Sequence, residues 1–288
     1  MKQVLSIIAA LVLAASCAPQ LTEQEKTNIA IYDRVYEAVA DKADLPTGEL
    51  ALAIAKEFLG TDYVSYTLEI EPEALQVFLD KTDCILFVEL CSSFALTVKG
   101  LKIEQGSDPV AAKPSYKLLC HNIQNMRYRG GVVDGYASRL HYTSEWLIQN
   151  AANGVLNEYT SELGEEFEQQ FFFMTTHPDS YKQLLDNPEE TAKVRAAEEY
   201  LESCKPYYYI SQERLMQDEV ISQIKDGDIV TFIDKHPGLD LAHVAMACTG
   251  EDGQMHFIHA SYGAKKVIFE PRTLAEYAKN GIRISRLK

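Results

Sequence analysis

Apolar and polar positions divide the chain into a helical first part and a strand-rich last part. Apolar residues recur at helical spacing over 28–40, and a second helix is expected at about 48–58. After Ile224 short apolar runs alternate with turn signals, which predicts strands at 228–233, 241–249, 254–260, 266–269 and 282–285. Helices first and strands later are typical of an α+β fold rather than of alternating βαβ units.

The middle of the chain is less regular. Residues 61–71 are rich in β-forming types and predict a strand or an extended segment. A short helix is expected to open at Glu71-Pro72-Glu73 and to carry Leu75 and Phe78. Residues 105–115 read as a loop. Helices are expected at 116–128, in a segment ending near Asn150, and after Asn187-Pro188, within a mostly helical region up to about 220.

The stretch 82–96 contains the most informative helix. After Cys84 come twelve residues with a single charge, Glu89, and a helix that is apolar on nearly all sides is buried on most of its faces. Asp83 is a favourable N-cap, which places Cys84 in the first turn. Helix N-termini favour a thiolate, so Cys84 is a candidate nucleophile; as a lone residue it would more often be a small core side chain.

Two histidines in the predicted 242–260 hairpin could serve this cysteine. If Cys248 faces Gln254 across a five-residue loop, His243 lies directly opposite His259 and on the same face. That face also carries small residues that would leave room for a helix. Cys248 and His256 point to the other face, which disfavours a metal site. His243 taken alone could equally be a satisfied core histidine, and a register slip of one residue would separate the two rings.

Together these residues predict nucleophilic catalysis. His243 would accept the Cys84 proton and later protonate the leaving amine, and His259 would hold the other ring nitrogen. The backbone N–H of Cys84 would contribute to an oxyanion hole. No metal or cofactor is expected.

The composition is that of a globular protein with a substantial core. The 288 residues are 47% hydrophobic and 24% charged, and the net charge of −15 argues against a nucleic-acid partner. Apart from Cys17 the chain has five cysteines, an odd number that leaves at least one thiol free.

The N-terminus has the pattern of an export signal. Lys2 precedes an apolar run up to Leu13, and small residues stand directly before Cys17, as in a bacterial lipobox. We therefore expect a signal peptide at 1–17, lipidation at Cys17, a tether at 18–27 and one domain at 28–288. Ala18 is not the Asp associated with inner-membrane retention, which favours an outer-membrane lipoprotein facing the periplasm. Ordinary cleavage nearby, with Cys17 incidental, is the alternative.

Several motifs occur in one order along the chain. They are Gly60-Thr61-Asp62-Tyr63, Asp83-Cys84, Ser138-Arg139-Leu140-His141-Tyr142, Asp226-Gly227-Asp228-Ile229, Gly238-Leu239-Asp240-Leu241-Ala242-His243-Val244 and His256-Phe257-Ile258-His259-Ala260-Ser261. This set resembles the DUF1460 family, known as N-acetylmuramoyl-L-alanine amidase-like, within the NlpC/P60 superfamily of papain-like cell-wall hydrolases. The resemblance covers most of the chain from about residue 28.

The resemblance implies a papain-like core, with the nucleophile helix on an antiparallel sheet and a mostly helical insertion at about 100–222. It implies cleavage of the amide between N-acetylmuramic acid and L-Ala, with anhydro-muropeptides as substrates and wall recycling as the role. By motif, Cys84, His243 and His259 would be catalytic. The residues implied to bind substrate are Tyr63, Asp83, Arg139, His141 and Asp240; from spacing alone, Arg139 would be a surface arginine.

Two alternatives stay open. The same machinery could act as a muropeptide endopeptidase, although Ile85 replaces the Ser that such enzymes usually carry after the cysteine. A wall-associated lipoprotein could also bind muropeptides without cutting them.

Overall fold

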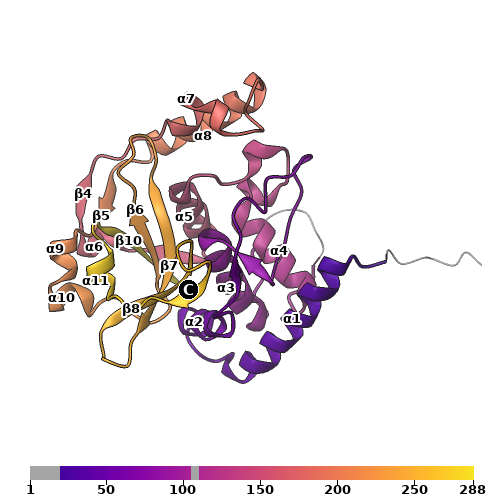
Figure 1. The fold of residues 1–288 in the computed structure, drawn as a ribbon, viewed down its shortest axis with the longest axis vertical. Helices are drawn as coiled ribbons and strands as arrows, with labels where there is room; N and C mark the ends of the chain where they lie inside the picture. Colours follow the sequence, from indigo (N-terminus) through magenta and orange to yellow (C-terminus); the bar gives the residue numbers. More distant parts are fainter. Residues whose placement is uncertain (1–19, 105–109) are drawn as a thin grey trace, which may run out of the picture.

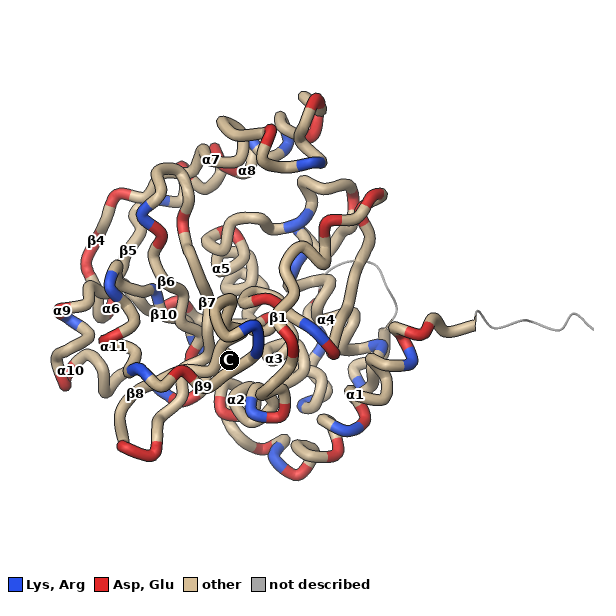
Figure 2. The backbone as a smooth tube through the Cα atoms, viewed as in Figure 1, with Lys and Arg blue, Asp and Glu red and all other residues tan. Residues whose placement is uncertain are grey.

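The computed structural model describes residues 20–104 and 110–288. The predicted signal peptide and Cys17 lie outside the described residues. Within the described part, no helix is long and apolar enough to cross a membrane. Figure 2 shows acidic and basic positions interleaved along the backbone.

An eight-stranded sheet runs through the middle of the molecule, in the order β2-β1-β9-β8-β7-β6-β10-β3 (Figure 1). Only the β1–β2 pair is parallel, and the other neighbours are antiparallel. The strands are β1 Asp62–Tyr63, β2 Lys81–Thr82, β3 Leu156–Glu158, β6 Ile229–Ile233, β7 Leu241–Thr249, β8 Met255–Ser261, β9 Lys266–Phe269 and β10 Ile282–Leu287. A separate pair is formed by β4 Glu165–Phe167 and β5 Tyr207–Tyr209.

Helices cover both faces of this sheet (Figure 1). Those on one side come early in the chain: α1 Glu23–Val39, α2 Thr47–Glu57, α3 Cys84–Val98 and α4 Tyr116–Arg127. The short α6 Thr160–Leu163, α9 Gln212–Leu215, α10 Asp218–Ile221 and α11 Leu274–Tyr277 lie on the other. The remaining helices are α5 Thr143–Ala152, α7 Phe173–Thr176 and α8 Pro188–Ser203, with 3-10 turns at Ala40–Lys42, Arg129–Gly131, Tyr136–Ser138 and Pro178–Ser180.

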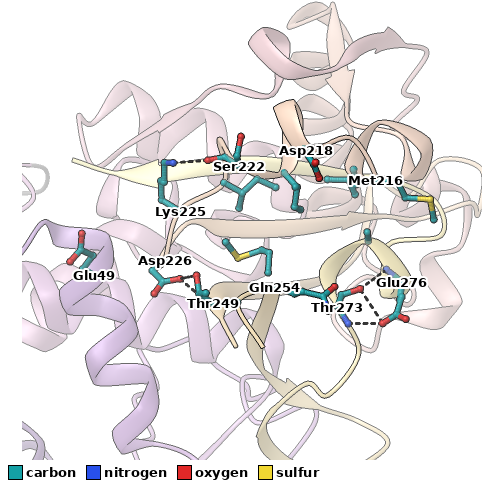
Figure 3. A pocket seen from close by; sticks show the side chains of 16 residues that line it. Glu49, Met216, Asp218, Ser222, Lys225, Asp226, Thr249, Gln254, Thr273 and Glu276 are labelled. Atoms are coloured by element: carbon teal, nitrogen blue, oxygen red, sulfur yellow. Dashed lines mark hydrogen bonds between the residues drawn. The ribbon is translucent and has the colours of Figure 1, made fainter. Parts of the chain in front are cut away.

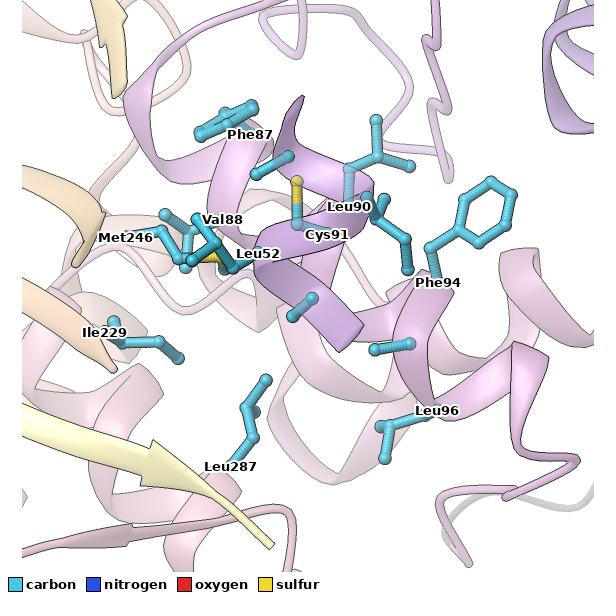
Figure 4. Packing of buried hydrophobic residues seen from close by; sticks show 14 of the residues in the cluster. Leu52, Phe87, Val88, Leu90, Cys91, Phe94, Leu96, Ile229, Met246 and Leu287 are labelled. Atoms are coloured by element: carbon cyan, nitrogen blue, oxygen red, sulfur yellow. The ribbon is translucent and has the colours of Figure 1, made fainter. Parts of the chain in front are cut away.

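The α3 helix is the centre of the larger hydrophobic core. All residues from Leu86 to Val98 are buried. They pack against α2, β7 and β8, and Leu52 of α2 and Met246 of β7 belong to the same core (Figure 4). The Asp83 side chain accepts a hydrogen bond from the Leu86 N–H at 3.0 Å, which fixes the start of the helix. The predicted N-cap and the predicted burial are therefore both confirmed, and α3 holds Cys84 at one end of a rigid buried element.

The α+β class and most element positions match the predictions, but two segments differ. The α1 helix begins at Glu23, inside the predicted tether, because Thr22 and Glu25 form a capping box. The predicted strand at 61–71 is reduced to Asp62–Tyr63, and the predicted helix after Pro72 is absent: residues 71–79 have no regular structure.

Candidate active site

Cys84 lies where α3 meets the start of β7. The Val244 N–H is placed to donate to its sulfur, and the N–H groups of Ile85 and of Cys84 itself add to this. Val244 directly follows His243, so the sulfur lies near the peptide group that joins the two residues. Cys84 also interacts electrostatically with Tyr63 and Tyr277.

The helix approaches the sheet from the face opposite to the one predicted. Val244 and Met246 pack under α3, whereas Ala245, Ala247 and Phe257 belong to a second core beneath α9–α11. His243 shares the second face, because alternate residues of a strand point the same way. The register pairs of β7 with β8 run from Met246 to Thr249, so His243 and Val244 lie beyond that ladder. The Cys84 sulfur lies near β7 at these two residues.

The hairpin register also differs from the prediction. Cys248 faces His256 rather than Gln254, because the five-residue loop is 250–254 and Thr249 pairs with Met255. His243 and His259 are therefore diagonal rather than directly opposed. They still share a face, and the Nε2 atom of His243 lies 2.6 Å from the Nδ1 atom of His259.

The electrostatics of the site favour neutral forms. Burial, and then the Asp83 carboxylate, raise the pKa of the Cys84 thiol to about 12, against the opposing effect of the surrounding N–H groups. The expectation that the helix N-terminus would produce a thiolate is not supported. Burial, followed by His259, lowers the pKa of His243 to about 3, and burial lowers the pKa of His259 to about 4. The resting site holds a thiol and two neutral imidazoles.

Three further residues, which the sequence patterns did not indicate, surround the imidazoles. The Oε2 atom of Glu270 lies 3.4 Å from the His259 Nε2 atom, and its Oε1 atom accepts from the Arg272 Nε–H at 2.7 Å. The Arg272 guanidinium lies over the ring of Tyr277. That ring packs edge-on or tilted against both imidazoles, with centroids 6.0 and 6.4 Å away.

Two cavities lie near Cys84, which lines neither of them. One, of about 360 Å³, is lined by His243, His259, Tyr262 and Tyr277. The other, of about 340 Å³, is lined by four of the five residues implied to bind substrate (Tyr63, Asp83, Arg139 and His141), together with Ile85, Tyr66 and Glu69. Tyr63 packs edge-on against Tyr262 at 5.6 Å, which links the two linings. The two chain neighbours of Cys84, Asp83 and Ile85, line the second cavity (the arginine cavity), and the two imidazoles line the first (the imidazole cavity).

Arg139 is buried rather than exposed. Its side chain is 7% accessible, and its Nη2 atom lies 3.1 Å from Glu69 and 3.5 Å from Glu73. The Nε and Nη2 groups nevertheless have no hydrogen-bond acceptor. The ring of neighbouring His141 contacts the Tyr136 carbonyl oxygen at 2.8 Å, and burial followed by Arg139 lowers the pKa of His141 to about 3.

Asp240 is the one predicted binding residue that does not line either cavity. It is 4% exposed, and its Oδ2 atom accepts a hydrogen bond of 2.6 Å from the Ser144 N–H in the first turn of α5. Burial raises the pKa of Asp240, against the hydrogen bonds from Ser144 and Leu241. These contacts describe an anchor for α5, so its role in substrate binding stays a prediction.

A larger cavity lies elsewhere in the part of the chain that the structure describes. It has a volume of about 1030 Å³ and lies among α9, α10, the start of α11 and the β7–β8 loop, with Met216, Lys225 and Gln254 in its lining (Figure 3). None of the predicted site residues lines it, so size alone does not identify the site. Over residues 20–104 and 110–288, no cluster of three or more His, Cys, Asp or Glu could hold a metal ion.

The chain resembles solved structures along most of its length. An N-acetylmuramoyl-L-alanine amidase from Bacteroides uniformis is 32% identical, with a TM-score of 0.74 over 84% of this chain and 99% of that chain. A Bacteroides fragilis protein described as a proposed xylanase is 32% identical, with a TM-score of 0.69 over 81% and 98%. A Legionella pneumophila protein described with the DUF1460 family shares the fold. It is 18% identical, with a TM-score of 0.65 over 92% of this chain and 95% of that chain.

No curated protein matches the chain. The family model described as AmiA-like, N-acetylmuramoyl-L-alanine amidase-like, matches residues 53–283. That span includes the predicted catalytic and binding residues and the strands β7 and β8, which carry the histidines. The chain therefore belongs to the AmiA-like (DUF1460) family of N-acetylmuramoyl-L-alanine amidase-like proteins.

Proposed function

We propose that this protein is a cysteine-dependent cell-wall hydrolase with a papain-like NlpC/P60 core. It would cleave the amide between N-acetylmuramic acid, in the anhydro form, and L-Ala in muropeptides, in wall turnover and recycling. The observation that carries the proposal is the position of the Cys84 sulfur, against the peptide group that follows His243, whose ring contacts His259 at 2.6 Å. Membership of an amidase-like family supports the bond type.

The mechanism follows from the neutral resting pair. As the sulfur of Cys84 attacks the lactyl carbonyl carbon, its proton passes to the Nδ1 atom of His243, since the Nε2 atom is occupied by His259. The backbone N–H of Cys84 would stabilise the oxyanion. Protonated His243 then gives the proton to the nitrogen of L-Ala, the C–N bond breaks, and a thioester remains. Water activated by His243 hydrolyses the thioester and restores the thiol.

The two cavities suit a substrate that extends on both sides of the scissile bond. In this proposal the peptide stem occupies the arginine cavity, where the Nε group of Arg139 has no acceptor and could bind a carboxylate, in competition with Glu69 and Glu73, which lie 3.1 and 3.5 Å from the Nη2 atom. Ile85 also lines this cavity and offers no hydroxyl to a free amine. This favours an amidase, whose substrate has no free amine at L-Ala, over an endopeptidase.

The test is to incubate the soluble mature protein with defined anhydro-muropeptides and to identify the broken bond by mass spectrometry. We expect free peptide beginning at L-Ala, no turnover by Cys84→Ala, and unchanged turnover by Cys204→Ser, a partly exposed cysteine on the α8 side of the molecule. Unchanged circular dichroism and melting would show that Cys84→Ala is folded. Full activity in Cys84→Ala would overturn the proposal.

The same assay separates the alternatives. Cleavage within the peptide would indicate an endopeptidase, and binding without any cleavage would indicate a wall-binding protein. Xylan is included as a second substrate because the Bacteroides fragilis relative is described as a proposed xylanase. Release of sugars from xylan, with no cut in the muropeptide, would contradict a cysteine amidase.

We further propose that the protein is exported and anchored in the outer membrane through lipid on Cys17, facing the periplasm. The support is the sequence pattern before Cys17. Metabolic labelling with a fatty-acid analogue should mark the full-length protein but not Cys17→Ser. Labelling of both, or of neither, would contradict the anchor.

A further inference from the structure

A carboxylate lies behind the two imidazoles, on the side of His259 away from His243. Glu270 directly follows β9, and its N–H donates to the Phe257 carbonyl oxygen at 2.9 Å, which places it beside the strand that carries His259. Its Oε2 atom is 3.4 Å from the Nε2 atom of His259. Glu270 is 4% exposed and His259 is 2% exposed, so water competes little for either group.

The two oxygens of this carboxylate have different partners. Oε1 accepts from the Arg272 Nε–H at 2.7 Å and from the Arg272 backbone N–H at 3.2 Å. Oε2 is the oxygen that faces His259. Although burial acts in the opposite direction, these Arg272 hydrogen bonds hold the pKa of Glu270 below its ordinary value. Glu270 is therefore ionised at neutral pH and can only accept hydrogen bonds.

The position of one proton decides whether His243 can act as a base. A neutral imidazole has one N–H and one lone pair, and the 2.6 Å contact between the rings needs one donor and one acceptor. If His259 donated through Nδ1, its Nε2 lone pair would face the Glu270 carboxylate, and the proton of His243 would be on Nδ1. If His259 instead carries its proton on Nε2, that N–H faces the carboxylate, the Nε2–H of His243 donates to His259, and the Nδ1 lone pair is free for the thiol.

We propose that Glu270 is a positioning residue that selects the reactive tautomer of His243 by acting through His259. The inference rests on the proposed function for its consequence, but the tautomer is a property of the free protein. The titratable and charged groups that face His259 are His243 of β7, Glu270 and Arg272 after β9, and Tyr277 of α11. Among them, only Glu270 is an obligate acceptor at neutral pH.

The test compares the wild-type protein with Glu270→Gln, because an amide can present either an oxygen or an NH₂ group to His259. Nitrogen-15 NMR of the imidazoles, recorded without substrate, should show His259 protonated on Nε2 in the wild type and a mixture of tautomers in the variant. On a muropeptide, kcat should fall about 10- to 100-fold, with KM within about twofold. Glu276→Gln is the matched control, because that carboxylate caps α11 through Thr273; it should leave both readouts unchanged.

A purely structural role is distinguished with Arg272→Gln. That variant loses the brace on Glu270 but keeps the carboxylate beside His259, so the tautomer should be retained. An unchanged tautomer in Glu270→Gln, or a wild-type His259 protonated on Nδ1, would overturn the inference. If the wild-type protein cleaves no muropeptide, the proposed function fails, and the NMR result still decides which tautomer Glu270 selects.

Discussion

The charge state of Cys84 before substrate binds can be measured directly. Two physical effects oppose each other at this residue: the N–H groups at the start of α3 and at Val244 favour a thiolate, while burial and the Asp83 carboxylate favour a thiol. Burial has the larger effect and raises the pKa of the Cys84 thiol to about 12. His243 is neutral for the same reason, with a pKa of about 3.

These pKa values determine how strongly the alkylation rate of Cys84 should depend on pH. A thiol with a pKa of about 12 is ionised in only about one molecule in 10⁵ at pH 7, whereas an ordinary cysteine is ionised in a few per cent. Because only the thiolate reacts with iodoacetamide, the alkylation rate of Cys84 should rise about tenfold for each pH unit from 7 to 10, without a plateau. Peptide mapping by mass spectrometry would isolate Cys84, with Cys204 as an internal reference and Cys84→Ser as the blank.

A thiolate–imidazolium pair would behave differently. Its alkylation rate would already be high at pH 5 and would stay level up to pH 8, and such a plateau would refute the argument that burial prevails. With a neutral pair, deprotonation of the thiol has to accompany attack on the substrate. The position of the lone pair on His243 then matters more than it would in an enzyme with a preformed thiolate.

The remaining predictions concern the surroundings of the site. Glu89→Ala should lower the free energy of unfolding in urea by about 3–5 kcal/mol, because it leaves the buried Arg127 guanidinium, now 2.8 Å from Glu89, without its counter-charge; replacing both residues by Met should cost much less, and equal losses would contradict this reasoning. Tyr66→Gly should raise the melting temperature, since a φ of 62° costs an L-residue about 1–2 kcal/mol; a lower melting temperature would count against backbone strain at this residue. The same variant should raise KM, because Tyr66 is 84% exposed and lines the arginine cavity. Asp240→Ala should reduce stability by about 1–3 kcal/mol, since the Ser144 N–H loses its acceptor; an unchanged KM would show that Asp240 only anchors α5, and a raised KM in a stable variant would support the predicted role in substrate binding.

Local signals account for the parts of the fold that the sequence predicted well. The N-caps of α3, α4 and α8 are Asp83, Ser115 and Asn187, and each side chain accepts a hydrogen bond from a backbone N–H in the first turn of its helix. The bounds of β7 and β9 agree with the predictions because turn residues delimit both strands. The α1 start was missed although its capping-box residues, Thr22 and Glu25, can be read from the sequence.

The segment after β1 could not be predicted in this way. Its backbone groups are satisfied by side chains from distant parts of the chain rather than by a helix or a ladder. Asn28 of α1 binds the Val77 carbonyl oxygen and the Leu79 N–H, and Arg127 of α4 binds the Gln76 carbonyl oxygen at 2.6 Å. Local propensity has no access to such contacts, so the helix expected after Pro72 does not form.

The prediction that His243 and His259 share a face is correct although the predicted register is wrong. The reason also shows how Glu270 can be placed from the sequence. Changing the register so that Cys248 faces His256 instead of Gln254 is a shift of two residues, which preserves the face on which every side chain lies. The same reasoning applied to the next hairpin uses the pairing of His259 with Ile268. Two residues further along these antiparallel strands, Glu270 lies opposite Phe257. Phe257 is on the same face as His259, so Glu270 is on that face too. A shift of one residue in that hairpin would turn the carboxylate away from the imidazole and leave both ring tautomers equally available, so the register of β8 with β9 matters to the site as much as the nucleophile helix does.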